Sequence, residues 1–431
     1  MFKREKEILT AYKVLGYEPR DNQVKIIDDV VHQFIDQKKQ NVLLTADTGV
    51  GKSLIGAVVS EVLSTIVDQK LAGVFLSSTN SLTLQYADSF KKLPEMKFFR
   101  VKGAGTYGCE YFKAKGNSFA TGEDCVKGEL SEIEVQKYCS TCEYKRAQGM
   151  INKTENLITN YAYFMISKLK SEHLLERNLQ VFDEAHLLNE VFCSQMSIEF
   201  SAELFDKLCK DLGDLNGKLD NEKADLILFK NELIAGKIKQ ANYMEKLKYL
   251  YKIYIAINTK CNTLANLIPD MKAKMKTRKI GSRFGRLSGL IGGLFEHKYD
   301  HVFDDTVKGT IAIKPIFIGD MMHLLLGRYN LFMTATMSPD FAETTMKLDH
   351  NKTAYITADS VFPAVNRPLF FVGKQNLNYV TMQDPATFRD LAKIVEYIVD
   401  HHKEDKGIII VPSFYATKQL SAAIPKSVKM F

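Results

Sequence analysis

The chain has 431 residues and a formal net charge of +7, with 45% hydrophobic and 25% charged residues. This balance is close to that of soluble globular chains, so it excludes a mostly disordered chain, a collagen-like repeat and a small disulfide-stapled fold. The modest basic excess permits a nucleic-acid partner without requiring one.

The amino-terminal residues are charged and lead into no apolar core of the kind that a secretory signal has. The longest apolar run, Leu54–Val67, contains Glu61 and is too short to cross a bilayer, which takes about 20 helical residues. We therefore expect a cytoplasmic protein with no membrane partner. In that reducing compartment the seven cysteines are not expected to form a disulfide framework.

Short apolar runs alternate with helical patterns in the first third of the chain, which is typical of a parallel α/β sheet. Strands are expected at residues 42–45, 74–76, 157–159 and 179–182. Residues 103–150 interrupt this rhythm with glycines, charges and four of the cysteines, so they are interpreted as an insertion.

A second change of pattern falls at residues 191–298, where apolar residues recur at helical spacing and no strand is expected. Strands resume at residues 310–313 and 330–333. A new unit is expected after Thr357, with strands at residues 369–372 and 407–411 on either side of a helix at residues 387–401.

A glycine-rich loop, Ala-Asp-Thr-Gly-Val-Gly-Lys-Ser, follows the first expected strand and opens a helix. Glycines allow backbone N–H groups to turn toward phosphates, and the helix N-terminus adds a favourable dipole. Lys52 is expected to reach the β- and γ-phosphates of ATP, and the Ser53 hydroxyl to bind Mg²⁺. The loop begins with Ala46, where the strict motif has glycine. The candidate nucleotide-binding residues in the loop are Thr48, Gly49, Val50, Gly51, Lys52 and Ser53.

Two carboxylates, Asp183 and Glu184, come directly after the strand expected at residues 179–182. Because parallel strands end at one edge of their sheet, this pair is expected beside the glycine-rich loop. Asp183 suits Mg²⁺ binding and Glu184 suits activation of the attacking water, so the candidate catalytic residues are Lys52, Asp183 and Glu184. Alone, the loop could bind nothing and the pair could be an exposed loop start. Their combination favours an ATPase.

These two motifs together resemble the signature pair of DEAH-type superfamily 2 helicases. The four cysteines between them narrow the resemblance to the iron–sulfur XPD/DinG-like DNA helicases. The resemblance implies an α/β fold with a RecA-like P-loop NTPase core. It also implies an inserted metal-cluster domain with four cysteine ligands, a helical arch insertion and a partial second RecA-like domain.

The resemblance also implies roles for residues outside the two motifs. Gln23, in the segment Arg-Asp-Asn-Gln, would read adenine. Thr79 and Asn80 would contact the DNA backbone. His186, Thr334 and Thr336 would couple hydrolysis to DNA binding; the last two lie in the segment Thr-Ala-Thr-Met-Ser-Pro.

The four clustered cysteines are Cys109, Cys125, Cys139 and Cys142. One CxxC pair and two isolated cysteines leave a 4Fe–4S cluster, a zinc ion and unliganded thiols open. The resemblance favours the 4Fe–4S cluster over zinc. The nearby aromatic residues Tyr107, Tyr111 and Phe112 are expected to pack around this small domain rather than to contact bases.

A basic stretch at residues 272–286 holds seven Lys or Arg residues and no acidic one. Its candidate DNA contacts are Lys272, Lys274, Lys276 and Arg278, and Phe284 among them could stack on a base. A solvated surface is the equally weighted alternative.

The domain boundaries that follow combine these observations. The first motor domain is expected at residues 1–108, 143–190 and 306–360, the cluster insertion at 109–142, the helical arch at 191–305 and the start of a second motor domain at 361–431. Nothing after Pro412 resembles the arginine-containing Q-x-x-G-R motif of the family. The alternatives are a truncated chain, a naturally short protein or a split gene, in which a separate chain supplies the rest.

The resemblance implies an ATP-dependent DNA helicase that moves 5′→3′ on single-stranded, tailed or forked DNA. The alternative is a nucleotide-responsive single-stranded DNA-binding module without productive unwinding. We expect the chain to bind ATP and DNA and to unwind poorly by itself.

Overall fold

A computed structural model describes residues 2–20, 22–67, 71–116, 118–125, 130–170, 177–215, 217–358, 378, 380–402, 408–411 and 413–424. The chain divides into two compact units, residues 1–361 and 362–431, which are treated separately below. Within the described part of the chain, no helix has both the length and the apolar character that a bilayer crossing requires.

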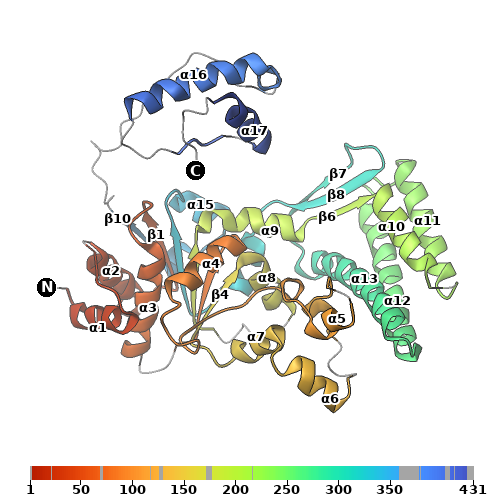
Figure 1. Cartoon of the computed structure of the whole chain (residues 1–431), viewed down its shortest axis with the longest axis horizontal. Coiled ribbons are helices and arrows are strands. Elements are labelled where there is room, and N and C mark those ends of the chain that lie inside the picture. The colour runs from red at the N-terminus through yellow and green to blue at the C-terminus, as the bar shows by residue number, and fades with distance from the viewer. Residues whose placement is uncertain are drawn as a thin grey trace. The chain divides into compact units, whose positions relative to one another are not determined.

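The first unit is built on a parallel sheet of seven strands (Figure 1). In their order across the sheet, the strands are β10 (Thr353–Ala358), β1 (Asn41–Ala46), β9 (Tyr329–Thr334), β5 (Leu179–Asp183), β2 (Gly73–Ser77), β4 (Asn156–Asn160) and β3 (Phe98–Arg100). The five strands predicted within residues 42–333 of this sheet are confirmed. The predicted parallel α/β character is also confirmed, and the arrangement is consistent with a RecA-like core.

Side chains of successive strand residues enter two different hydrophobic cores, as the two-residue period of a strand requires. On β1, Val42 and Leu44 pack with the first three helices, whereas Leu43 joins the core on the opposite face. On β5, Val181 and Phe182 divide in the same way. The sheet is therefore covered on both faces, which explains why its strands carry consecutive apolar residues rather than an alternation of apolar and polar ones.

Helices of the sheet region flank these strands. They are α1 (Glu5–Leu15), α2 (Gln23–Ile35), α3 (Lys52–Ile66), α4 (Asn80–Ser89), α8 (Tyr161–Lys170), α9 (Leu188–Met196), α14 (Gly319–Leu325) and α15 (Pro339–Thr344). α3 starts immediately after the glycine-rich loop and α4 starts three residues after β2 ends, so both N-termini lie at the carboxyl edge of the sheet.

A helical region extends from one end of the sheet region (Figure 1). It consists of α10 (Ala202–Gly213), α11 (Asp220–Ile234), α12 (Tyr243–Leu267) and α13 (Met271–His297). The prediction of no strand at residues 191–298 is wrong, because β6 (Ile198–Ser201) pairs with β8 (Thr310–Pro315), which also pairs with β7 (His301–Asp304). The strand predicted at residues 310–313 is thereby confirmed, in a small antiparallel sheet.

The cysteine-containing insertion has short helices, α5 (Glu110–Ala114), α6 (Glu132–Glu134) and α7 (Glu143–Ile151). Its core is formed by Tyr111, Phe112 and Ala120, and Met271 and Met275 of α13 pack against it. Tyr107, Tyr111 and Phe112 are all buried, so the prediction that they pack is confirmed.

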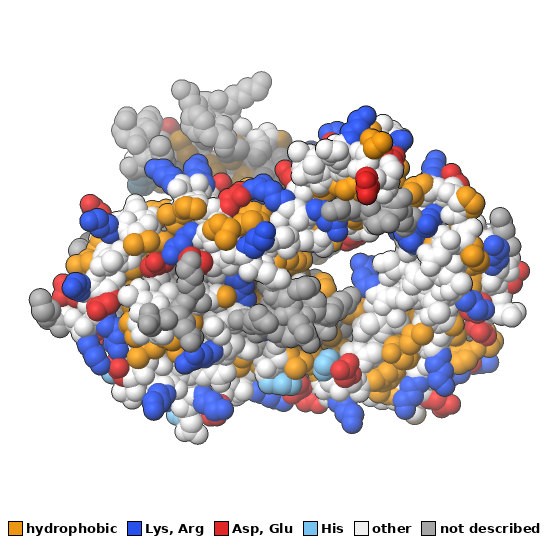
Figure 2. All heavy atoms as spheres, turned by 90° about the horizontal axis from the view of Figure 1, so that it is seen from below, with side chains coloured by type: hydrophobic (Ala, Val, Ile, Leu, Met, Phe, Trp, Pro, Cys, Tyr) orange, Lys and Arg blue, Asp and Glu red, His pale blue; other side chains and the backbone are white. Residues whose placement is uncertain are grey.

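In the space-filling view, an opening passes through the molecule and Lys and Arg side chains lie near its rim (Figure 2).

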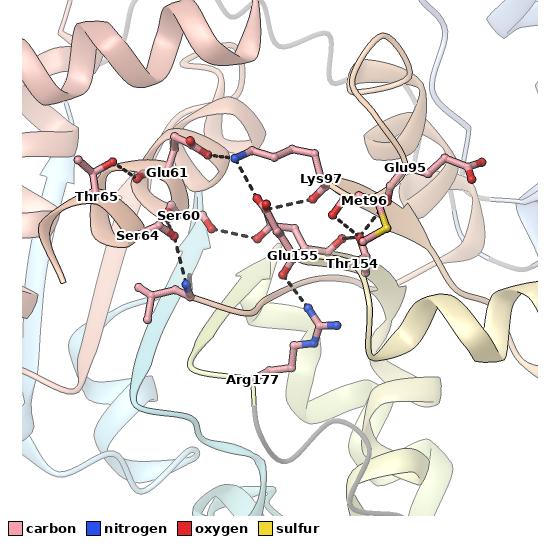
Figure 3. A network of polar contacts seen from close by, with 12 residues as sticks. Ser60, Glu61, Ser64, Thr65, Glu95, Met96, Lys97, Thr154, Glu155 and Arg177 are labelled. Carbon is pink, nitrogen blue, oxygen red and sulfur yellow. Dashed lines mark hydrogen bonds and ion pairs between the residues drawn. The ribbon is translucent and has the colours of Figure 1, made fainter. Parts of the chain in front are cut away.

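A polar network fixes the amino-terminal edge of the large sheet (Figure 3). The Lys97 ammonium bridges Glu61 of α3 and Glu155 at the start of β4, at 2.5 and 2.9 Å. The buried Arg177 guanidinium donates to the carbonyl oxygens of Glu155, Gly73 and Ile151. Because these contacts lie where the strands begin, they hold α3 and the neighbouring strands in register at the edge opposite the glycine-rich loop.

The second unit contains α16 (Pro385–His401) and α17 (Phe414–Ala423) among its described residues. They pack through Phe388, Ala392, Ala416 and Leu420, and the helix predicted at residues 387–401 is confirmed. The strand predicted at residues 369–372 and Gly407 lie outside the described residues. Residues 408–411 are described and form no strand.

Candidate nucleotide and metal site

The glycine-rich loop has a backbone that only glycine adopts easily at two positions. Gly49 has φ +94° and Gly51 has φ +87°. A Cβ atom on Gly51 would stand 2.5 Å from the Gln23 amide nitrogen. This close approach gives the second glycine a steric reason as well as a conformational one.

The Gln23 side chain contacts the glycine-rich loop, and its amide oxygen already accepts two hydrogen bonds. Its Nε2 donates to the Val50 carbonyl at 2.7 Å, and its Oε1 accepts from the Tyr12 hydroxyl at 2.8 Å and from the Arg20 N–H at 2.9 Å. The Arg20 guanidinium also donates to the Gly49 carbonyl at 3.1 Å. In this structure Gln23 therefore holds the loop, and an adenine ring would have to displace one of the donors to Oε1.

The structure brings the three candidate catalytic side chains together at the carboxyl edge of β1 and β5. Lys52 Nζ donates to the Ala46 carbonyl at 3.1 Å and lies 3.9 Å from Glu184 Oε1. Lys52 and Asp183 are each only 8% exposed, whereas the Glu184 side chain remains partly open to solvent. An open carboxylate beside a buried ammonium is well placed to meet a water molecule that attacks a phosphate.

Glu184 has a left-handed backbone, with φ +53° and ψ +49°. Such a conformation costs a non-glycine residue on the order of 1 kcal/mol, and residues of this kind concentrate at functional sites. The turn redirects the chain directly after β5, so that Asp183 stays buried while the Glu184 carboxylate turns toward Lys52.

Asp183 carries the features of a carboxylate built to bind a cation. Its Oδ1 is buried and has no hydrogen-bond partner among the described residues. Burial, and next the charge of Glu184, raise the pKa of Asp183 to about 6. A bound divalent cation would coordinate the unpaired Asp183 oxygen and neutralise its unfavourable buried charge, so the residues present fit Mg²⁺.

This raised pKa gives a prediction about stability without metal. Above about pH 6 the buried Asp183 carboxylate is ionised, and its charge lowers the free energy of unfolding by the full amount. Below about pH 4 Asp183 is protonated in both the folded and the unfolded chain, so this penalty disappears. Since a rise from 3.8 to about 6 corresponds to on the order of 3 kcal/mol, Asp183→Asn is expected to increase the free energy of unfolding at pH 7.5 by up to that amount. Urea unfolding in EDTA at several pH values would measure it.

The gain from Asp183→Asn is expected to shrink as the pH falls from 6 toward 4. Glu199→Gln, which alters an exposed carboxylate on β6, is the control and should show no such trend. A less stable Asp183→Asn variant at pH 7.5 would contradict the assignment of a buried, disfavoured charge.

His186 connects the acidic turn to the end of β9. Its Nδ1 lies 3.1 Å from the Thr334 hydroxyl, which also accepts from the Thr336 N–H at 3.2 Å. The structure therefore brings together all three residues predicted to couple hydrolysis to DNA binding. His186 Nδ1 also lies 3.5 Å from Glu184 Oε2, so this chain of contacts ends at the candidate catalytic carboxylate.

Thr79 and Asn80 begin α4 at the same edge of the sheet. The Thr79 hydroxyl caps the helix by accepting from the Leu82 N–H at 3.2 Å. The Asn80 side chain accepts from Asn160 at 3.0 Å, and the Arg100 guanidinium donates to the Asn80 carbonyl at 2.8 Å. The start of α4 is thus a fixed, polar surface within the first unit.

The basic stretch forms the first half of α13, and acidic neighbours engage part of it. Lys276 lies 2.7 Å from Asp214, and Arg283 lies 2.7 Å from Asp211. Phe284 is fully buried against Tyr254, with ring centroids 5.3 Å apart, so the proposed stacking of Phe284 on a base is wrong. Lys272 is exposed, whereas Lys274 and Arg278 are half-buried.

The four clustered cysteines line one pocket together with Tyr138 and Lys145. No disulfide joins any of the seven cysteines, all of which are described. Burial raises the pKa of the Cys109 thiol, while the N–H groups of Phe112 and Tyr111 lower it. Among the described residues, no group of three or more His, Cys, Asp or Glu side chains is placed to hold a single metal ion.

Two tyrosines at the site were not predicted from the sequence. Tyr12 reaches Gln23 from α1, and Tyr86 reaches the metal side of the site from α4. Burial, and next the charge of Asp183, raise the pKa of Tyr86 well above its ordinary value. Neither tyrosine lies in a motif, and each meets the site only through tertiary packing.

Comparison with known proteins agrees with this geometry. Residues 16–206 match the family described as Type III restriction enzyme, res subunit. The matched range contains the glycine-rich loop and the acidic turn, and it indicates a superfamily 2 helicase-like ATPase. A search of the curated proteins found no match.

Proposed function

We propose that the chain is an ATP-dependent helicase of the DEAH type that acts on single-stranded DNA. The observation that carries the proposal is the convergence of Lys52, Asp183 and Glu184 beside a glycine-rich loop at one sheet edge. The helicase-like ATPase class of residues 16–206 supports ATP hydrolysis and nucleic-acid binding. The 5′→3′ direction and the DNA substrate rest on the family resemblance.

In this proposal the loop residues from Thr48 to Ser53 hold the phosphates of ATP. Lys52 exchanges its contact with Ala46 for the β- and γ-phosphates, and Asp183 with Ser53 would hold Mg²⁺. A bound Mg²⁺ neutralises charge that develops on the phosphate oxygens. Glu184 orients the attacking water and accepts its proton, and His186 with Thr334 and Thr336 reports the state of Glu184 to the rest of the sheet.

Steady-state ATP hydrolysis with and without single-stranded DNA tests this function. A rate that rises severalfold on addition of a single strand is the expected result. A rate that does not respond to single-stranded DNA, duplex DNA or RNA would contradict a helicase-type ATPase. Strand displacement on a 5′-tailed duplex then separates the helicase from a nucleotide-responsive DNA-binding module.

Thr79, Asn80 and the exposed part of the basic stretch are the proposed DNA contacts. Since several lysines and arginines of α13 are paired with aspartates, we expect fewer phosphate contacts there than the seven positive charges would allow. Binding of single-stranded DNA should still weaken steeply between about 50 and 200 mM salt if about six phosphates are contacted in total.

We extend the proposal to a 4Fe–4S cluster held by Cys109, Cys125, Cys139 and Cys142. Each thiolate of such a cluster binds a different iron, so the four sulfurs stand further apart than around one zinc ion. The four cysteines line a shared pocket, which supports a common role for them, and the choice of a cluster over zinc rests on the family resemblance. By resemblance the cluster would be structural, and Met271 and Met275 would connect it to the helical region.

Cys142→Ser is expected to lose the iron and the broad absorbance near ~400 nm while ATP binding remains. The pocket and the nucleotide site lie in separate parts of the first unit, which is why binding should survive. Iron and zinc analysis of protein purified without oxygen measures the effect, with Cys193→Ser as the control. Colourless protein with one zinc per chain would contradict the cluster.

A further inference from the structure

Tyr86 is a buried tyrosine whose hydroxyl lies beside Ser53 and Asp183 but makes no well-aligned hydrogen bond to any described residue. Its ring packs against Phe75 of β2, with centroids 6.3 Å apart, and the residue is 5% exposed. A buried hydroxyl left unpaired costs about 1–3 kcal/mol. Such a group requires an explanation, because packing alone would be served as well by phenylalanine.

The side chains around the Tyr86 hydroxyl provide this explanation. It faces the Ser53 hydroxyl and the Asp183 carboxylate, the two side chains proposed to hold Mg²⁺. Asp183 Oδ1 is itself buried and unpaired. Two buried polar groups from different elements, α4 and β5, therefore adjoin at the same place, where the hydroxyl can donate to the carboxylate and a bound cation would satisfy the unpaired Asp183 oxygen.

A tyrosine hydroxyl can donate one hydrogen bond to a carboxylate oxygen or to a metal-bound water. Donors of this kind fix the orientation of metal ligands, and their loss commonly costs about 10- to 100-fold in metal affinity or activity. The rigid setting of Tyr86 suits that task, since the first turn of α4 is tied to Arg100 and Asn160.

We propose that Tyr86 is a positioning residue for the metal ion, and that its hydroxyl orients Asp183 and the water shell of the cation. This inference rests on the proposed ATPase function and adds to it a residue outside the two sequence motifs. It also ties the metal site to α4, the helix whose first residues are the proposed DNA contacts.

The test is Tyr86→Phe, which removes the hydroxyl alone. The Mg²⁺ concentration for half-maximal ATP hydrolysis should rise by about 10-fold or more. Nucleotide binding in EDTA should stay at the parent value, because the phosphate loop is untouched.

Tyr254→Phe is a matched control. Tyr254 is also fully buried with an unpaired hydroxyl, but it packs against Phe284 in the helical region. This variant should keep the parental Mg²⁺ dependence. If Tyr86→Phe does the same while the parent hydrolyses ATP, the positioning role is refuted and the proposed function stands. If the parent protein neither binds nor hydrolyses ATP, the proposed function fails, and this inference fails with it.

Discussion

Glu184→Gln is expected to lower ATP turnover by about 10²- to 10⁴-fold while ATP binding remains. The amide keeps the size of the side chain beside Lys52, but it cannot accept the proton of the attacking water. Asp183 and Ser53 are unchanged in this variant, so Mg²⁺ and the phosphates keep their ligands. Single-turnover hydrolysis and equilibrium ATP binding, measured on the same preparation, separate the two effects.

The matched control for this variant is Glu190→Gln, which changes an exposed carboxylate on the first turn of α9. That variant should hydrolyse ATP at the parent rate. Parental turnover in Glu184→Gln would show that Glu184 is not the base. The left-handed backbone at this residue would then lack a catalytic explanation.

Lys52→Ala is expected to weaken ATP binding by roughly 10- to 100-fold. A hydrogen bond to a charged group contributes about 1.5–3 kcal/mol, and tenfold in affinity corresponds to about 1.4 kcal/mol. The ammonium is buried and lies between the Ala46 carbonyl and Glu184, so no neighbouring cation can replace it without rearrangement of the loop. Equilibrium titration with a fluorescent ATP analogue measures the loss.

Two controls locate this effect at the terminal phosphates. AMP, which has no β- or γ-phosphate, should bind the parent and Lys52→Ala equally. Lys39→Ala, which removes an exposed ammonium bonded to the Asn351 carbonyl, should bind ATP as the parent does. Equal ATP affinity of the parent and Lys52→Ala would overturn the assignment of the loop as a phosphate site.

The strands of the large sheet could be predicted where their residues are buried on both faces. β1, β2, β4, β5 and β9 each carry two or three consecutive buried apolar residues for that reason. β6 was missed because it is short and half-exposed, with Glu199 pointing outward between Ile198 and Phe200. A strand of that kind depends on its partner β8, which is more than a hundred residues away in the chain.

The residues of the candidate site also fall into a group that the sequence predicts and a group that it does not. Lys52, Asp183 and Glu184 belong to local motifs, so the sequence could predict them, whereas Tyr86 meets them only because α4 folds over the sheet edge. The basic residues around Phe284 suggest that it stacks on a nucleic-acid base, and this prediction is wrong. The spacing of Phe284, four from Ile280 and seven from Ile291, places all three on one helical face, and that face is buried.

The hydrophobic core on one face of the large sheet does not end at the sheet. It continues without interruption from Leu43 and Phe182 through Phe200 to Leu294 of α13. Cooperative unfolding follows shared burial, so calorimetry should record the sheet and the helical region melting in one transition. For the same reason, deletion of residues 202–297 would expose the buried side chains of Phe200 and Ile313 to solvent. We expect the remaining sheet region to aggregate rather than to fold as a minimal ATPase.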